Sequence, residues 1–175
     1  AKLMHQEVTL AQSLRRAKAL SYDVVAGVPV GGLLLAVAYA LEASVPLIYS
    51  RPQPEGTGER GIEGRYSSGS RALLIDDLIA GGTSIQDTAR FLAEHDILVH
   101  DAVVLVDRDL GAQHRLKQMG INLISILKLD VMMNLYHADG LITEEQYQGY
   151  LTYAHSARAQ AHEEYGGIST TGPQA

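Results

Sequence analysis

Leu73-Leu74-Ile75-Asp76-Asp77-Leu78-Ile79-Ala80-Gly81-Gly82-Thr83-Ser84 is the stretch that decides the fold of this 175-residue chain. An apolar run carries two adjacent carboxylates and is followed by a glycine pair and two hydroxyl residues. Apolar residues at helical spacing come next, from Ile85 to Leu92. This order predicts a strand, a tight loop of the size that holds a phosphate, and the beginning of a helix.

The loop between that strand and that helix is a candidate sugar phosphate site. The first turn of a helix offers unpaired N–H groups and the positive end of the helix dipole. Gly81 and Gly82 let the backbone approach a ligand closely. Asp76 and Asp77 suit the hydroxyl groups of a sugar or a divalent metal. The alternative is an ordinary strand end closed by a tight turn. The stretch lacks the Gly-Lys-Ser/Thr ending of a Walker A loop and the glycine spacing of a dinucleotide site.

Composition limits the classes of function. The length suits one domain with its own core. A net charge of -6, with 14 scattered Lys and Arg residues, argues against a nucleic-acid partner. The lack of cysteine excludes disulfides and thiolate chemistry and suits a reducing compartment. Pro29 and two glycines interrupt the longest apolar stretch, so no membrane span is expected. The chain begins with Ala1, which leaves a natural start farther upstream open.

Strands and helices are expected to alternate along most of the chain, which indicates an α/β fold with a parallel sheet. Besides the central unit, helices are predicted over 3–20, 30–43 and 111–120, and strands over 23–27, 46–50, 97–106 and 121–127. Residues 51–70 contain two prolines and five glycines and are predicted to form a long loop.

The C-terminal part is predicted to be a helical pair over 129–138 and 143–161, with a capped start at Thr143. Its tyrosines are interpreted as core or subunit-contact residues rather than ligand-binding ones: Tyr136, Tyr147, Tyr150 and Tyr153. Residues 1–165 are expected to form a single domain, and the polar stretch 166–175 a disordered tail.

The stretch 73–84 resembles the phosphoribosyl pyrophosphate (PRPP) motif of the type I phosphoribosyltransferases, and within that family the chain is most similar to the orotate phosphoribosyltransferases. Segments 25–29, 45–48 with Arg51, 62–64 and 103–108 match in order and spacing, and the resemblance covers roughly 23–135. It implies a Rossmann-like parallel sheet flanked by helices, with a long mobile loop and a C-terminal helical pair.

The resemblance also implies an activity. A pentosyltransferase of this kind moves the 5-phosphoribosyl group of PRPP to orotate, giving orotidine 5'-monophosphate and pyrophosphate in pyrimidine nucleotide biosynthesis. It implies Mg²⁺ as cofactor, bound mainly through PRPP and near Asp76 and Asp77. It further implies a cytoplasmic homodimer.

Site residues are carried over by the same resemblance. The PRPP site would comprise Arg51, Asp76, Asp77, Leu78, Ile79, Ala80, Gly81, Gly82, Thr83 and Ser84. The pyrophosphate loop would comprise Val28, Pro29, Val30, Gly31 and Gly32. Ala80 and Arg108 would contact orotate. On sequence alone the Gly31-Gly32 pair is equally consistent with a strand-to-helix turn. Likewise, Arg108 is equally consistent with a surface ion pair to Asp107 or Asp109.

Two departures from the family pattern keep other functions open. Pro52 and Glu55 stand where the family's mobile loop has lysines that cover the pyrophosphate, so the catalytic residues stay unassigned. Ala80 stands where the family usually has Thr. The alternatives are therefore a non-catalytic PRPP- or nucleotide-binding protein, and a phosphoribosyltransferase for another base.

Overall fold

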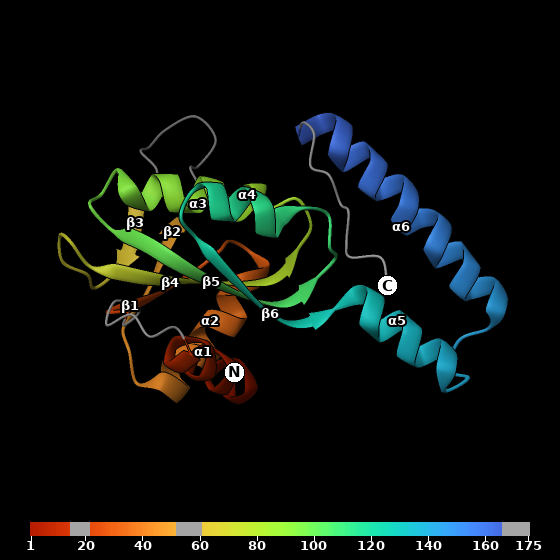
Figure 1. The fold of residues 1–175 in the computed structure, drawn as a ribbon. Coiled ribbons are helices and arrows are strands. Elements are labelled where there is room, and N and C mark those ends of the chain that lie inside the picture. Colours follow the sequence, from red (N-terminus) through yellow and green to blue (C-terminus); the bar gives the residue numbers. More distant parts are fainter. Residues whose placement is uncertain (15–21, 52–60, 166–175) are drawn as a thin grey trace.

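The computed structural model describes residues 1–14, 22–51 and 61–165. Its centre is a six-stranded sheet in the order β3-β2-β1-β4-β5-β6 (Figure 1). The strands are β1 (Val24–Gly27), β2 (Leu47–Arg51), β3 (Gly61–Gly64), β4 (Arg71–Ile79), β5 (Leu98–Asp107) and β6 (Asn122–Lys128). Neighbouring strands are parallel except β2 and β3. The predicted α/β fold is confirmed, with an antiparallel edge strand added.

Helices cover both faces of the sheet, so its central strands are apolar along their length. Helices α1 (Lys2–Leu14) and α2 (Gly31–Ala43) pack on one face, and α3 (Thr83–Ala93) and α4 (Ala112–Gln118) on the other (Figure 1). In β4 the burial is continuous from residue 72 to residue 76. The helix predicted over 3–20 is described only to Leu14, because residues 15–21 lie outside the described residues.

The prediction of one long loop over 51–70 is wrong at two places. Arg51 is the last residue of β2, and residues 61–64 form β3, which pairs with β2 through Ser50↔Ile62 and Ile48↔Gly64. Gly64 has φ +107°, and a Cβ there would lie 2.3 Å from the Leu47 carbonyl oxygen, so the pairing requires glycine. Residues 52–60, with Pro52 and Glu55, lie outside the described residues.

The predicted C-terminal helical pair is present as an arm of α5 (Leu129–Ala138) and α6 (Glu144–Tyr165), which extends from the β6 edge of the sheet (Figure 1). The predicted cap is also present: the Thr143 and Gln146 side chains each accept a hydrogen bond from the other's backbone N–H, at 3.2 and 2.9 Å.

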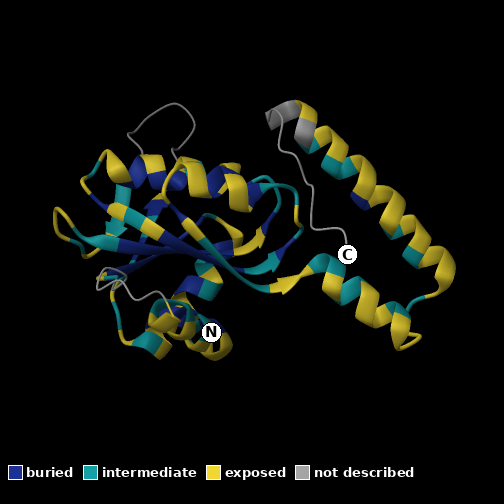
Figure 2. Cartoon of the chain, viewed as in Figure 1, coloured by how far each residue is buried: buried dark blue, intermediate teal, exposed yellow. Residues whose placement is uncertain are grey.

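Most of this arm is exposed, as Figure 2 shows, and α5 has no buried residue. None of the four tyrosines at 136, 147, 150 and 153 is buried, so the core interpretation of them is wrong. The predicted tail, 166–175, lies outside the described residues. Among the helices of the described ranges, none has the length and apolar character needed to cross a membrane.

Candidate substrate-binding site

The loops after β1 and β4 meet at the carboxyl edge of the sheet, where ligands bind in parallel α/β folds. The two strands are paired neighbours, with Gly27 opposite Ile75. Beyond the last pair, the Val28 N–H donates a hydrogen bond of 2.9 Å to the Ile75 carbonyl. The sheet register therefore places the predicted pyrophosphate loop, 28–32, directly beside Asp76 and Asp77.

A side chain at Gly31 would meet the Asp77 carboxylate, and one at Gly32 would meet the backbone of β4 and the Asp76 carboxylate. A Cβ on Gly31 would lie 2.3 Å from Oδ2 of Asp77. A Cβ on Gly32 would lie 2.3 Å from the Ile75 carbonyl oxygen and 3.0 Å from Oδ1 of Asp76. The peptide bond between Pro29 and Val30 is cis. Helix α2 begins at Gly31, so the positive end of its dipole faces the same site.

The two aspartates differ in environment. Asp76 is 7% exposed, whereas Asp77 is exposed. Burial raises the pKa of Asp76 to about 7, although the backbone N–H of Asp77 donates a 2.9 Å hydrogen bond to its Oδ1 and so opposes the shift. A ligand that supplies a cation or hydroxyl donors would favour the ionised form of Asp76. The ionisation of Asp76 therefore depends on what lies beside it.

The predicted phosphate loop, residues 80–84, has a backbone form that suits an anion. Helix α3 begins at Thr83, directly after Gly82, which has φ +86° and provides no side-chain cap. The Thr83 and Ser84 side chains are exposed. The amides of the first turn and these hydroxyl groups can therefore surround an oxyanion.

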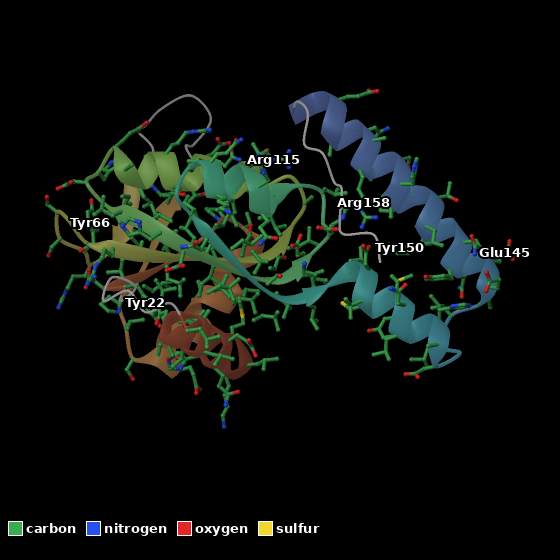
Figure 3. All side chains as sticks on the ribbon, viewed as in Figure 1. Tyr22, Tyr66, Arg115, Glu145, Tyr150 and Arg158 are labelled. Carbon is green, nitrogen blue, oxygen red and sulfur yellow. The ribbon has the colours of Figure 1, made fainter. Side chains whose placement is uncertain are left out.

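Arg115 of α4 makes a hydrogen bond to this loop. It was not among the site residues predicted from the sequence. Its Nε donates a 2.6 Å hydrogen bond to the Gly81 carbonyl, and a terminal nitrogen donates one of 2.9 Å to the Leu110 carbonyl. Figure 3 labels Arg115 on α4.

Arg108 lies at the end of β5, beside the phosphate loop. Its N–H donates a 2.9 Å hydrogen bond to the Ile79 carbonyl, which places its backbone next to Ala80. Its guanidinium carbon lies 5.5 Å from the centre of the Tyr153 ring on α6. Asp109, one of its two predicted surface partners, pairs with Arg158 at 3.4 Å.

The neighbouring Asp107 is buried, which raises the pKa of its carboxyl, and it accepts a 2.8 Å hydrogen bond from the Asp109 N–H. The end of β5 is thus fixed from several sides.

Arg51 is placed at the same edge of the sheet, at the carboxyl end of β2. Its guanidinium pairs with the Glu63 carboxylate of β3 at 3.3 Å, with both side chains exposed. An exposed pair of this kind contributes little to stability, so the arginine is available for an anionic ligand.

Asp76 and Asp77 are the residues near which the family resemblance implies a metal. Within the described ranges, no group of three or more His, Cys, Asp and Glu side chains is placed to hold a metal. A divalent cation near Asp76 and Asp77 would take its other ligands from water or from a bound polyphosphate, as Mg²⁺ commonly does.

A model of the phosphoribosyl transferase domain family matches residues 8–123. An orotate phosphoribosyltransferase from Cenarchaeum symbiosum is 42% identical over 123 residues, covering 69% of this chain and 61% of the relative. One from Saccharolobus solfataricus is 30% identical, covering 77% and 70%. The crystal structure of the Aeropyrum pernix orotate phosphoribosyltransferase superposes with a TM-score of 0.63 at 32% identity, covering 79% of this chain and 77% of that one. The chain thus spans less than two thirds of the first of these relatives.

Proposed function

The chain belongs to the phosphoribosyl transferase family, and from this membership we propose that it is an orotate phosphoribosyltransferase. It would transfer the 5-phosphoribosyl group of PRPP to orotate, releasing pyrophosphate and forming orotidine 5'-monophosphate in pyrimidine nucleotide biosynthesis. One observation carries the proposal: the glycine loop 28–32 lies against Asp76 and Asp77, next to an uncapped helix start at Thr83. This arrangement supports a site for a ribose that bears a pyrophosphate and a 5-phosphate.

Each part of PRPP has a counterpart in the proposed site. The 5-phosphate would lie on the amides and hydroxyls of residues 80–84. The ribose hydroxyls would donate to Asp76 and Asp77. The pyrophosphate would lie at loop 28–32 and the start of α2, with Arg51 as a cation from the strand next to it. Arg108 and Ala80 would border the orotate.

The reaction proposed is a displacement at the anomeric carbon of ribose. The bond from this carbon to the pyrophosphate oxygen breaks, a bond to the orotate ring nitrogen forms, and the configuration inverts. The proton of that ring nitrogen is released to the departing pyrophosphate or to water. Orotate is already electron-rich, so the chain's main tasks are to align the two substrates and to exclude water. Mg²⁺, bound through PRPP near Asp76 and Asp77, would neutralise the leaving pyrophosphate.

Two features of the sequence support competing functions. Pro52 and Glu55 replace the cations that cover pyrophosphate in the family, which favours a protein that binds PRPP without turning it over. Ala80, beside Arg108, favours a base other than orotate. We further propose a homodimer and a cytoplasmic location, on the basis of the family resemblance and, for the location, the lack of cysteine.

An assay of the chain with orotate, PRPP and Mg²⁺ tests the proposal. The expected result is orotidine 5'-monophosphate and pyrophosphate in equal amounts, and a lack of product would overturn it. Calorimetry with PRPP separates the alternatives: binding without product from any base supports the non-catalytic protein. Product from another member of a panel of pyrimidines and purines supports a different base.

A further inference from the structure

We propose that Arg115 is a positioning residue for PRPP: by holding the Gly81 carbonyl, it orients the phosphate loop so that its amides face the 5-phosphate. This inference rests on the proposed function. Arg115 lies on α4, outside the stretch that resembles the PRPP motif, and its contact with Gly81 spans 34 positions of the sequence.

The contacts of Arg115 join two loops to one helix. Its side chain donates to the carbonyl of Gly81 in the phosphate loop and to that of Leu110 in the loop that follows Arg108, at 2.6 and 2.9 Å. Arg115 is only 9% exposed. Hydrogen bonds from a charged donor are stronger than neutral ones, and a planar guanidinium fixes the direction of both. The phosphate loop therefore has a rigid reference point on α4.

The geometry of the peptide bond explains why this matters for an anion. In a trans peptide, the C=O and the following N–H point in opposite directions. Because the Gly81 carbonyl is directed to Arg115, the Gly82 N–H is directed away from α4. The reverse orientation would present the negative end of a carbonyl to the phosphate. Arg115 thus favours the arrangement in which the loop is a donor.

Close packing makes this arrangement specific. A Cβ on Gly82 would lie 3.2 Å from the Ala112 side chain, and one on Gly111 would lie 3.8 Å from the Arg115 guanidinium. The phosphate loop, the start of α4 and Arg115 therefore form one packed unit. A shorter or neutral side chain at 115 would free the Gly81 peptide to rotate.

Arg115→Met and Arg115→Lys test the proposal in the full chain, with PRPP as the probe. Arg115→Met is expected to raise the PRPP Kd by calorimetry, and its KM in turnover, roughly tenfold, because the Gly81 peptide would be free to rotate in the unbound chain and would have to be ordered when PRPP binds. Arg115→Lys retains the charge and one donor direction, so its PRPP Kd and KM are expected to lie between those of the unaltered chain and those of Arg115→Met. The orotate KM should stay within about twofold, because the Arg108 backbone is held independently by its hydrogen bond to the Ile79 carbonyl. General loss of structure would not produce this split. Lys117→Met is the control, because it removes an exposed charge from the same helix.

The outcomes separate this inference from the proposed function. An unchanged PRPP Kd in both Arg115 variants would overturn the inference alone. A lack of PRPP binding by the unaltered chain would overturn both. Binding of PRPP without turnover would overturn the proposed activity, and the calorimetric comparison would still decide the role of Arg115. If Arg115→Met does not fold, as shown by circular dichroism, Arg115→Lys decides in the same way.

Discussion

At the scale of single residues, Gly31 and Gly32 make a matched pair, because alanine would meet different atoms at each position. At Gly32 the new Cβ meets the backbone of β4, which cannot yield, so Gly32→Ala should destabilise the fold by about 1–3 kcal/mol. At Gly31 it meets only the end of the Asp77 side chain, so Gly31→Ala should leave stability nearly unchanged and displace this carboxylate. Thermal unfolding and PRPP calorimetry distinguish the two effects. Equal losses of stability would contradict this account.

Asp76 should make stability depend on pH. Burial raises its pKa from 3.8 in the unfolded chain to about 7, so the native state holds the proton more tightly. The stability gained from that proton is complete below the unfolded pKa and is lost as the pH rises through about 7. Asparagine cannot ionise, so the free energy of unfolding of Asp76→Asn should not fall in this way. Relative to the unaltered chain, it should rise by up to about 4 kcal/mol between about pH 4 and pH 8. Urea unfolding across this range measures the difference. Parallel curves for the two proteins would refute the prediction.

The residues of the candidate site could be predicted where they lie close together in the sequence. Asp76, Asp77 and Gly82 are close together in the sequence, and their spacing alone indicates a phosphate loop. The different environments of the two carboxylates were not predictable, because the burial of Asp76 depends on β1 and α2. Arg115 was missed for the same reason: an arginine in a helical pattern is typical of a solvated surface, and only the fold places it at Gly81.

At the scale of elements, α6 should owe its position to a few polar contacts. Arg158 bonds to Asp130 at the start of α5 and to Asp109, and Tyr150 bonds to the same Asp130. Figure 3 labels Arg158 and Tyr150 on α6. Because these groups are partly exposed, their interactions should stabilise the attachment of α6 by about 1 kcal/mol or less. Arg158→Met should speed amide hydrogen exchange in α6 a few-fold. Arg90→Met on α3, where the pair with Asp87 is local, is the control. Unchanged exchange in α6 would show that other contacts hold the arm.

The elements also show what a sequence pattern can predict. Strand β4 was evident from the apolar run Leu73-Leu74-Ile75, which the structure places in a stretch of five consecutive buried residues. Strand β3 was missed because Gly61-Ile62-Glu63-Gly64 is short, has one apolar residue and is flanked by glycine, so its own pattern is that of a loop. Its strand conformation depends on pairing with β2, which the sequence of residues 61–64 does not reveal.

At the scale of the whole molecule, one stripe of exposed apolar side chains is a candidate interface with a partner. Leu34 and Leu41 are 82% and 77% exposed and share one side of α2 with Val37, and Val30, which directly precedes the helix, is 76% exposed. Such a stripe is costly in water, and a second copy of the chain would cover it in the proposed homodimer. Leu34→Glu should therefore yield monomers in sedimentation equilibrium, because it would place two like charges in a buried interface.

The matched control for this prediction is Leu135→Glu, on the exposed surface of α5, which should leave the dimer intact. If Leu135→Glu rather than Leu34→Glu produced monomers, the arm would be the interface and the stripe on α2 would not. A monomeric unaltered chain would contradict the homodimer itself. In that case the site beside Asp76 and Asp77 would have to function with the residues of one chain, including the segment 52–60 that follows Arg51.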